Sequence, residues 1–279
     1  MAVTLQERYS SLVDAKLRYS LVQRDGNIWN NRYEGDPKAG AVKIPVRDTE
    51  ATVAQYNKES GVATSTTTGS FITATIDKDY AVNEVIDGYV ANAVPDNLVA
   101  DRLDSAGYSL ALQMNEDATT ELLKGDAMGD TAALTKDNVY EKIVDTRKEM
   151  SKRKIPNVGR FLLVTPDVMA LILTAPEFIK ASALGDEVVQ SGAVGRIAGF
   201  TVYEDATIVG KKKNSNTVEF IAGHPNWCCR VKEWAVEPRV QDLAGSGKFI
   251  GASAVQGRYI YTHKVTKTNT VLIKAVAGK

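Results

Sequence analysis

Alternating apolar and polar residues predict two strands in the first third of the chain, joined by an unusually long connection. Residues 41–47 and 70–76 both alternate, which is typical of strands with one buried face. Roughly twenty residues separate them, whereas hairpin loops usually have about two to five. A two-stranded arm has too little core to be stable by itself in water. We therefore expect the arm to lie on another surface, and the first hypothesis is a second copy of the protein.

The leader before the arm combines a helical pattern with apolar loop residues. In residues 4–22 apolar side chains recur at helical spacing, and Thr4 is available as the N-cap. Ile28, Trp29 and Tyr33 follow among turn-forming residues and need a surface to cover them. The pattern indicates an arm rather than a part of the core.

A long helix is predicted after the stranded arm. Pro95 suits a first helical turn, and Gly125 marks the expected end. At about 1.5 Å per residue the helix would be roughly 45 Å long, which is longer than most helices of compact enzymes. Apolar residues recur along it at steps typical of one buried face: Val99, Leu103, Leu110, Met114, Ala118 and Leu122.

The remaining sequence is first α/β and then strand-rich. A helix over residues 137–152 precedes a buried strand at 160–164, and Thr165-Pro166-Asp167 is typical of a helix cap and first turn. No repeat or interdomain linker is visible, so any second domain is inserted within the first. The other predicted features are a mobile loop at 185–195, a polar turn at 211–216, and strands within 196–203, 217–223, 235–237, 256–262 and 270–276.

Composition indicates a folded chain without a bias toward charged partners. It has 279 residues, of which 44% are hydrophobic, enough for one large domain or two interleaved ones. Lys+Arg and Asp+Glu both number 34, so no overall field favours nucleic acid or an anionic membrane. No apolar run approaches the roughly 18 residues that span a bilayer, and the N-terminus lacks a signal-peptide core. We expect synthesis and folding in the cytoplasm.

Residues that could support catalysis or metal binding are few and poorly spaced. His224, Cys228 and Cys229 lie close in sequence, but a tetrahedral metal site needs more ligands. The adjacent cysteines are expected to be reduced packing thiols, since a bond between neighbours would be strained. Residues 245–249 resemble the end of a phosphate-binding loop but lack its first glycine and its Ser or Thr. We predict no enzyme activity, no cofactor and no metal.

Three segments carry a resemblance to a known family. They are GRFLLVTPD at 159–167, GRIAGFTVY at 195–203 and FIAGH at 220–224. With the order of the elements, they resemble the major capsid proteins of tailed bacteriophages over nearly the whole chain. The resemblance implies an α+β fold with an N-terminal arm (1–35), an extended two-stranded loop (36–78), a peripheral domain with a long spine helix (79–150 and 233–279), and an inserted α/β axial domain (151–232).

The implied function is a coat subunit that self-assembles into pentamers and hexamers of an icosahedral shell enclosing double-stranded DNA, without sequence-specific binding. The chain begins at Met1 with no room for a long cleaved scaffolding region, so a separate scaffolding protein and a portal are expected partners. The expected location is the virion capsid, assembled in the host cytoplasm, with no membrane. Contacts between subunits are expected at the arm and the leader: Val42, Ile44, Val46, Ile72, Ile76 and Trp29.

Two alternatives stay open on the sequence. An encapsulin-like compartment would share the fold and enclose protein cargo. A soluble α/β enzyme with a regulatory arm would need a catalytic constellation, which the sequence does not display. Lys43 or Lys58 could match the crosslinking lysine of some relatives, but no asparagine and glutamate complete that pattern, so crosslinking is not expected.

Overall fold

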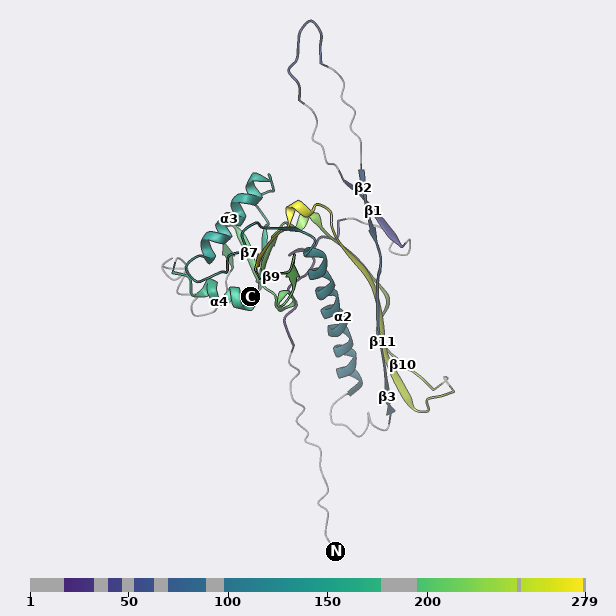
Figure 1. The fold of residues 1–279 in the computed structure, drawn as a ribbon. Coiled ribbons are helices and arrows are strands. Elements are labelled where there is room, and N and C mark those ends of the chain that lie inside the picture. Colours follow the sequence, from purple (N-terminus) through teal and green to yellow (C-terminus); the bar gives the residue numbers. More distant parts are fainter. Residues whose placement is uncertain are drawn as a thin grey trace.

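The computed structural model describes residues 18–32, 40–46, 53–62, 70–88, 98–176, 195–244 and 247–277. Figure 1 shows an α/β body, a long narrow sheet beside a helix, and a thin arm that projects away from both. Of the residues predicted to form the first helix, 18–22 are described and are not helical, whereas residues 4–17 lie outside the described residues. The predicted mobile loop at 185–195 lies outside them except for Gly195.

The α/β body is built around β5 (Phe161–Val164), which pairs with a parallel neighbour on one side and an antiparallel neighbour on the other. All four of its residues are buried, as expected of a strand covered on both faces. The sheet runs in the order β4 (Asp126–Ala127), β12 (Leu272–Val276), β9 (Asn216–Gly223), β5, β7 (Phe200–Glu204) and β6 (Arg196–Ile197), and β8 (Lys212–Lys213) also pairs with β9.

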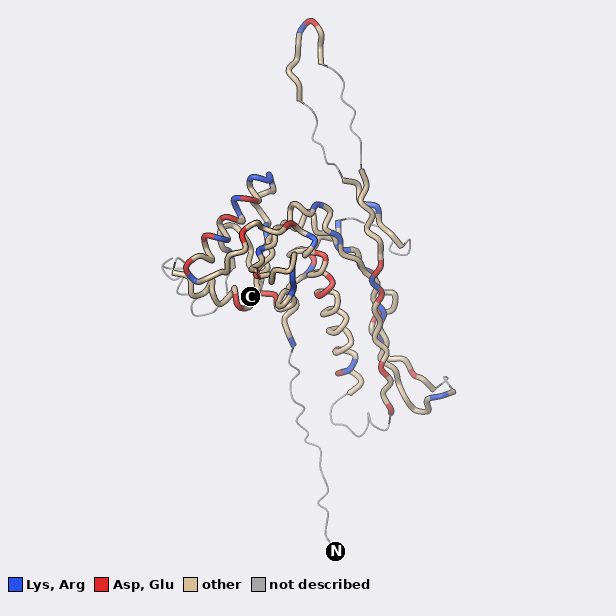
Figure 2. Tube along the Cα trace, viewed as in Figure 1, with Lys and Arg blue, Asp and Glu red and all other residues tan. Residues whose placement is uncertain are grey.

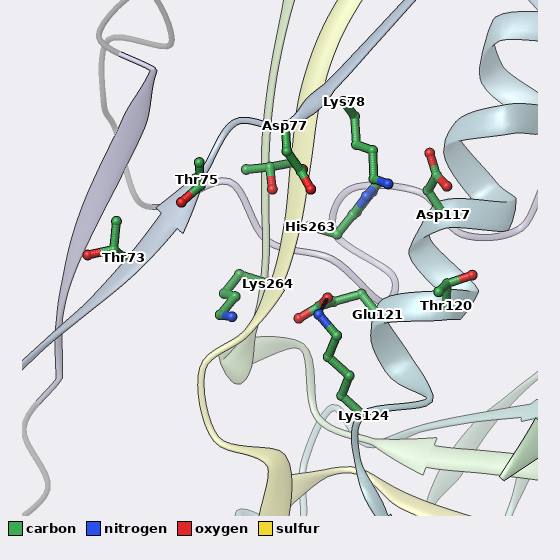
Figure 3. A pocket seen from close by; sticks show the side chains of 11 residues that line it. Thr73, Thr75, Asp77, Lys78, Asp117, Thr120, Glu121, Lys124, His263 and Lys264 are labelled. Atoms are coloured by element: carbon green, nitrogen blue, oxygen red, sulfur yellow. Dashed lines mark ion pairs between the residues drawn. The ribbon is translucent and has the colours of Figure 1, made fainter.

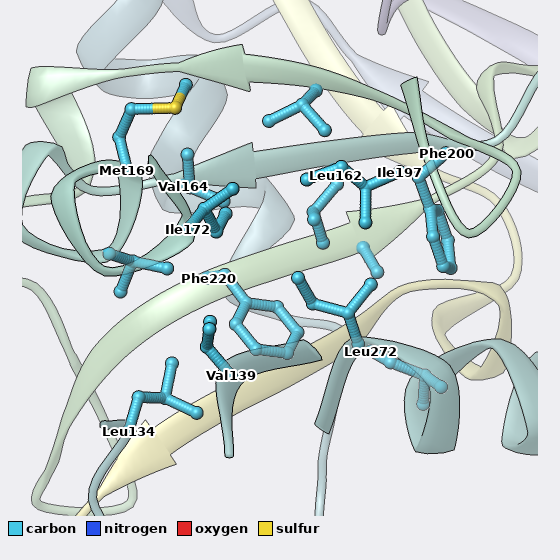
Figure 4. Packing of buried hydrophobic residues seen from close by; sticks show 14 of the residues in the cluster. Leu134, Val139, Leu162, Val164, Met169, Ile172, Ile197, Phe200, Phe220 and Leu272 are labelled. Carbon is cyan, nitrogen blue, oxygen red and sulfur yellow. The ribbon is translucent and has the colours of Figure 1, made fainter. Parts of the chain in front are cut away.

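Helices α3 (Val139–Lys152) and α4 (Pro166–Leu173) cover one face of this sheet. Leu162 and Phe220 point into the cluster between the sheet and these helices (Figure 4). Leu163, the next residue along β5, faces the opposite cluster, because successive side chains of a strand point to opposite faces. The predicted helix cap is confirmed: the Thr165 side chain accepts a hydrogen bond from the backbone N–H of Val168.

A three-stranded antiparallel ribbon forms the second part of the fold. Its order is β10 (Cys228–Asp242), β11 (Ala252–Val265) and β3 (Lys78–Asp87). Helix α2 (Leu98–Leu122) lies along it and packs on Val255 and Ile86 through Ala106 (Figure 1). The predicted long helix is therefore present, while the strands predicted at 235–237 and 256–262 are parts of much longer strands.

The arm consists of β1 (Ala41–Val46) and β2 (Ser70–Thr75). They pair antiparallel, from Ala41 opposite Thr75 to Val46 opposite Ser70, as their alternation predicts. Residues 53–62 form the described part of the tip, which lies far from the body (Figure 1).

Packing divides the chain differently from the sequence-based domain boundaries. Helix α3 and strand β12 were placed in the peripheral part, but both belong to the α/β body. Strand β10 crosses the expected boundary between residues 232 and 233 without interruption. Sequence order does not reveal which sheet a strand joins, because pairing partners are distant in the chain.

The core of the α/β body generates a stability prediction. Phe220 is fully buried in the central strand β9, so Phe220→Ala should lower the free energy of unfolding by about 3–5 kcal/mol. Val209→Ala is the control, because Val209 is 53% exposed and its truncation should change stability by less than about 0.5 kcal/mol. Urea unfolding of the unassembled subunit measures both. A loss below about 1 kcal/mol for Phe220→Ala would contradict this packing.

Candidate subunit interface

The tip of the arm carries apolar side chains that its own subunit leaves uncovered. Val53 is 94% exposed, Tyr56 70% and Val62 46%. The tip has a defined turn, in which Asn57 bridges to Gly61 and its side chain accepts a hydrogen bond from the backbone N–H of Glu59 at 2.8 Å. Exposed apolar side chains gathered on a projecting element are typical of an interaction site.

The far end of the ribbon carries a second set of exposed apolar residues. It lies where β10 and β11 are connected, away from the α/β body (Figure 1). Ile250 there is 95% exposed. The set comprises Val85, Val240, Phe249 and Ile250.

The inner face of the arm is covered by its own chain, which corrects part of the predicted interface. Val42 and Ile44 pack with Cys229 and Val231 of β10. Val46 is buried as well, so none of the three predicted arm residues on β1 is available to a neighbour. The sequence shows that one face of β1 is apolar, but it does not show which surface covers that face.

The predicted contact residues Ile72, on β2, and Ile76, just after it, are less deeply buried than those on β1. Ile76 is partly buried against the same cluster, and Ile72 is half-buried, so a contact of either with a neighbour stays a prediction. Phe71, which was not predicted, is 66% exposed and is the large apolar side chain that β2 presents to the outside. Its position one residue from Ile72 places it on the other face of the strand.

Trp29 also requires a correction. It is fully buried and packs, with Ile28, into the cluster that contains Leu122 of α2 and Ile273 of β12. The described leader residues near Trp29 are therefore part of the core of their own subunit and do not form an arm that binds a neighbour.

A buried polar clamp fixes the leader to the ribbon. Arg230 on β10 donates from Nε to Nε2 of His263 at 2.8 Å and from Nη2 to the backbone carbonyl of Gln23 at 2.9 Å. It also forms an ion pair with Asp25 at 3.2 Å. The Trp29 ring meets the His263 ring edge-on, with 4.7 Å between centroids. Because Arg230 donates to Nε2, that nitrogen carries no proton.

A second network ties the same leader to α2 and to the α/β body. The Gln23 side chain donates to Thr119 Oγ1 at 2.6 Å and to Asp205 Oδ2 at 2.8 Å, and it accepts a hydrogen bond from Trp29 Nε1. Tyr19 donates from its hydroxyl to the backbone carbonyl of Glu204 at 2.9 Å. The leader thus joins the helix to the sheet.

The adjacent cysteines pack on opposite faces of β10. Cys228 faces the leader and the α/β body, whereas Cys229 faces the arm. Burial raises the pKa of both thiols, that of Cys229 to about 12, so they stay protonated at neutral pH. The pair serves as packing groups, as the sequence predicts.

A polar cavity of about 220 Å³ lies at the base of the arm, between β2, α2 and β11 (Figure 3). Its charges are mixed: Glu121 pairs with Lys124, and Asp117 accepts a hydrogen bond from Tyr261 at 2.8 Å. Within the described ranges, no three or more His, Cys, Asp or Glu side chains are grouped as a metal would need. His224 instead accepts a hydrogen bond from the backbone N–H of Asn226.

Charges of both signs are mixed along α3 and the ribbon. Figure 2 shows Lys and Arg interspersed with Asp and Glu along both. In the part of the chain that the structure describes, no helix is both long enough and apolar enough to cross a membrane.

Comparison with known proteins shows the family of this chain. The model of the family described as phage capsid protein matches residues 90–264, more than half of the chain. The chain belongs to this phage capsid protein family. It is a major capsid protein, structural rather than enzymatic, and a component of the virion capsid. The match favours neither the encapsulin-like compartment nor the α/β enzyme.

Solved structures confirm the predicted tailed-phage capsid fold. A structure from Mycobacterium phage Che8 has a TM-score of 0.77 at 19% identity, covering 97% of this chain and 96% of that one. The capsid of cyanophage P-SCSP1u gives 0.77 at 10% identity, covering 98% and 93%. The mature capsid of bacteriophage PhiM1 gives 0.73 at 14% identity, covering 99% and 93%. Among curated proteins, no sequence matches this capsid protein.

The leader clamp generates a pH prediction. Burial lowers the pKa of His263 well below 6.5, and Arg230, Lys78 and Lys232 lower it further. The unfolded chain therefore binds a proton at His263 more readily than the folded subunit. The free energy of unfolding should fall as pH drops below about 6.5, with His263 contributing up to about 1.4 kcal/mol per pH unit.

The variant His263→Gln isolates this contribution, because glutamine still offers an oxygen to Arg230 but does not titrate. Urea unfolding of the unassembled subunit between pH 7 and pH 5 should show a shallower pH dependence for the variant. His224, whose pKa burial also lowers, titrates in both proteins and cancels in the comparison. Equal slopes for the two proteins would refute the role assigned to His263.

Proposed function

We propose that this capsid protein forms pentamers and hexamers of an icosahedral shell around double-stranded DNA, and that each arm tip lies on a neighbouring subunit. The observation that carries the proposal is the tip itself, where Val53, Tyr56 and Val62 are exposed on an element that projects away from the body (Figure 1). Burial of such a side chain against a neighbour contributes about 1.5–3 kcal/mol. Each shell repeats this contact many times.

The geometry supports a contact between different surfaces of successive subunits. The tip of one subunit would meet a surface of the next that is not another tip, and such head-to-tail contacts close into rings when the rotation allows. Pro45 on β1 is consistent with a specific contact between the arm and a neighbour. It has no backbone N–H to donate, and so it disfavours unspecific strand pairing at the edge of the arm.

The interior and the accessory partners follow from the proposed shell. With no net charge, a shell of this protein would contain DNA without holding it by a strong overall field. We propose a separate scaffolding protein and a portal as partners, and assembly in the host cytoplasm. We assign α2 and the ribbon β10–β11–β3 to the peripheral part and the seven-stranded body, including α3 and β12, to the axial part.

The tip can be tested without disturbing the fold. Replacing Val53, Tyr56 and Val62 together by serine should leave the free energy of unfolding of the subunit within about 0.5 kcal/mol, since all three side chains are exposed. Shell formation should be strongly impaired, and deletion of residues 49–69 should impair it as well. Light scattering and negative-stain microscopy of the purified protein measure assembly.

Lys58→Ala is the matched control, because Lys58 lies in the same exposed turn and contributes no large apolar side chain. It should assemble as the unaltered protein does. If the triple-serine variant and the deletion both give shells of normal size and stability, the arm tip does not hold subunits together.

A further inference from the structure

A second cavity, of about 450 Å³, opens between the leader and one end of the sheet in the α/β body. Its walls come from Gly26, Asn27 and Arg32 of the leader, from residues between 156 and 161 at the start of β5, from β7, and from residues 224–226 after β9. Two arginines line it, Arg32 and Arg160, and none of the described residues that line it is Asp or Glu.

The two arginines lack a carboxylate partner among the described residues. Arg32 is exposed and donates from Nη2 to the side-chain oxygen of Asn226 at 2.5 Å. Arg160 is buried, and its guanidinium donates to the carbonyls of Ile155 at 2.6 Å and Pro156 at 2.8 Å. Carbonyl oxygens satisfy its N–H groups but do not neutralise its charge.

Arg32 and Arg160 differ in this respect from five other arginines of the subunit. Ion pairs with carboxylates are formed by Arg18, Arg102, Arg153, Arg230 and Arg258. The two arginines that line this cavity therefore bring positive charge to its wall that no described carboxylate pairs with.

Neighbouring arginines lower the pKa of two groups that line this wall, in addition to the effect of burial. Burial lowers the pKa of Arg160, and Arg147 lowers it further. Burial is also the largest influence on the pKa of His224, which Arg160 and Arg32 lower as well. None of the described residues that line the cavity is acidic, so an anionic group entering it would meet the positive charge of Arg32 and Arg160.

The rim of the cavity is apolar next to this charge. Val158 is 85% exposed, and Pro156 is exposed beside it. A fitting ligand therefore combines a negative group with an adjacent apolar side chain. Double-stranded DNA does not fit this description, since its phosphates lie on a convex surface without apolar groups beside them.

The arm tip has the complementary combination. Glu59 is exposed in the turn that also presents Tyr56 and Val53. The tip projects away from its own body, so it can reach this cavity only on another copy (Figure 1). We propose that the cavity receives the arm tip of a neighbouring subunit, with the Glu59 carboxylate facing Arg32 and an apolar tip residue covering Val158. This inference rests on the proposed shell-forming role of the arm.

Charge reversal tests the pairing on the full-length chain. Arg32→Glu and Glu59→Arg should each raise the protein concentration needed for assembly by about tenfold, because a like-charge contact replaces an attractive one. The double variant Arg32→Glu/Glu59→Arg should restore assembly to within about twofold of the unaltered protein. Light scattering as a function of protein concentration gives these values, and circular dichroism confirms that each variant is folded.

Lys58→Glu is the matched control, because it reverses an opposite charge in the same turn. It should assemble at the same or a lower concentration than the unaltered protein, since the cavity repels Lys58. Failure of the double variant to restore assembly, or normal assembly of both single variants, would overturn the pairing. If the triple-serine tip variant remains impaired in that case, the arm still holds the shell and only the receptor is wrong. Loss of DNA retention by Arg32→Glu with normal assembly would identify a nucleic-acid contact instead and overturn the inference.

Discussion

The antiparallel pairing of β10 with β11 is the interaction on which the other parts of the subunit depend. It extends from Cys228 opposite Val265 to Asp242 opposite Ser253. The other edge of β11 pairs with β3. One face of β10 contacts the arm near Cys229, and the opposite face contacts the leader near Cys228. Adjacent residues of a strand face opposite sides, so one short stretch of β10 anchors two segments that are distant in sequence. A slip by one residue would exchange the two faces and detach both.

The base of the arm is packed on its own subunit, so assembly does not have to order it. Val42 and Ile44 are covered by β10 before any neighbour arrives, so the base of the arm is already ordered. A segment that becomes ordered on binding loses conformational entropy, which weakens association. An arm that is already ordered at its base loses less entropy when it binds. The free apolar surface is left at the tip and on Phe71, where a neighbour can reach it. The arm therefore acts as a positioned projection, not as a strand pair that needs a partner in order to fold.

The sequence predicted the elements that are determined by residues close together in the chain. The alternation in β1 and β2, the apolar face of α2 and the Thr165 cap with Pro166 each depend on residues within a few positions of one another. The burial of Trp29 was missed because its partners Arg230 and His263 are about two hundred residues away in the chain. The arginine-lined cavity was missed for the same reason, since its walls come from four separate segments. The exposed tip residues were visible only as part of a long polar connection.

The central claim is that the arm of each subunit lies on a neighbour in a closed shell. A cryo-electron-microscopy reconstruction of particles assembled from the purified chain tests it directly. The account predicts rings of five and six subunits in which residues 53–62 of each subunit lie on an adjacent one. Closed particles in which those residues touch only their own subunit, or project into solvent, would contradict it.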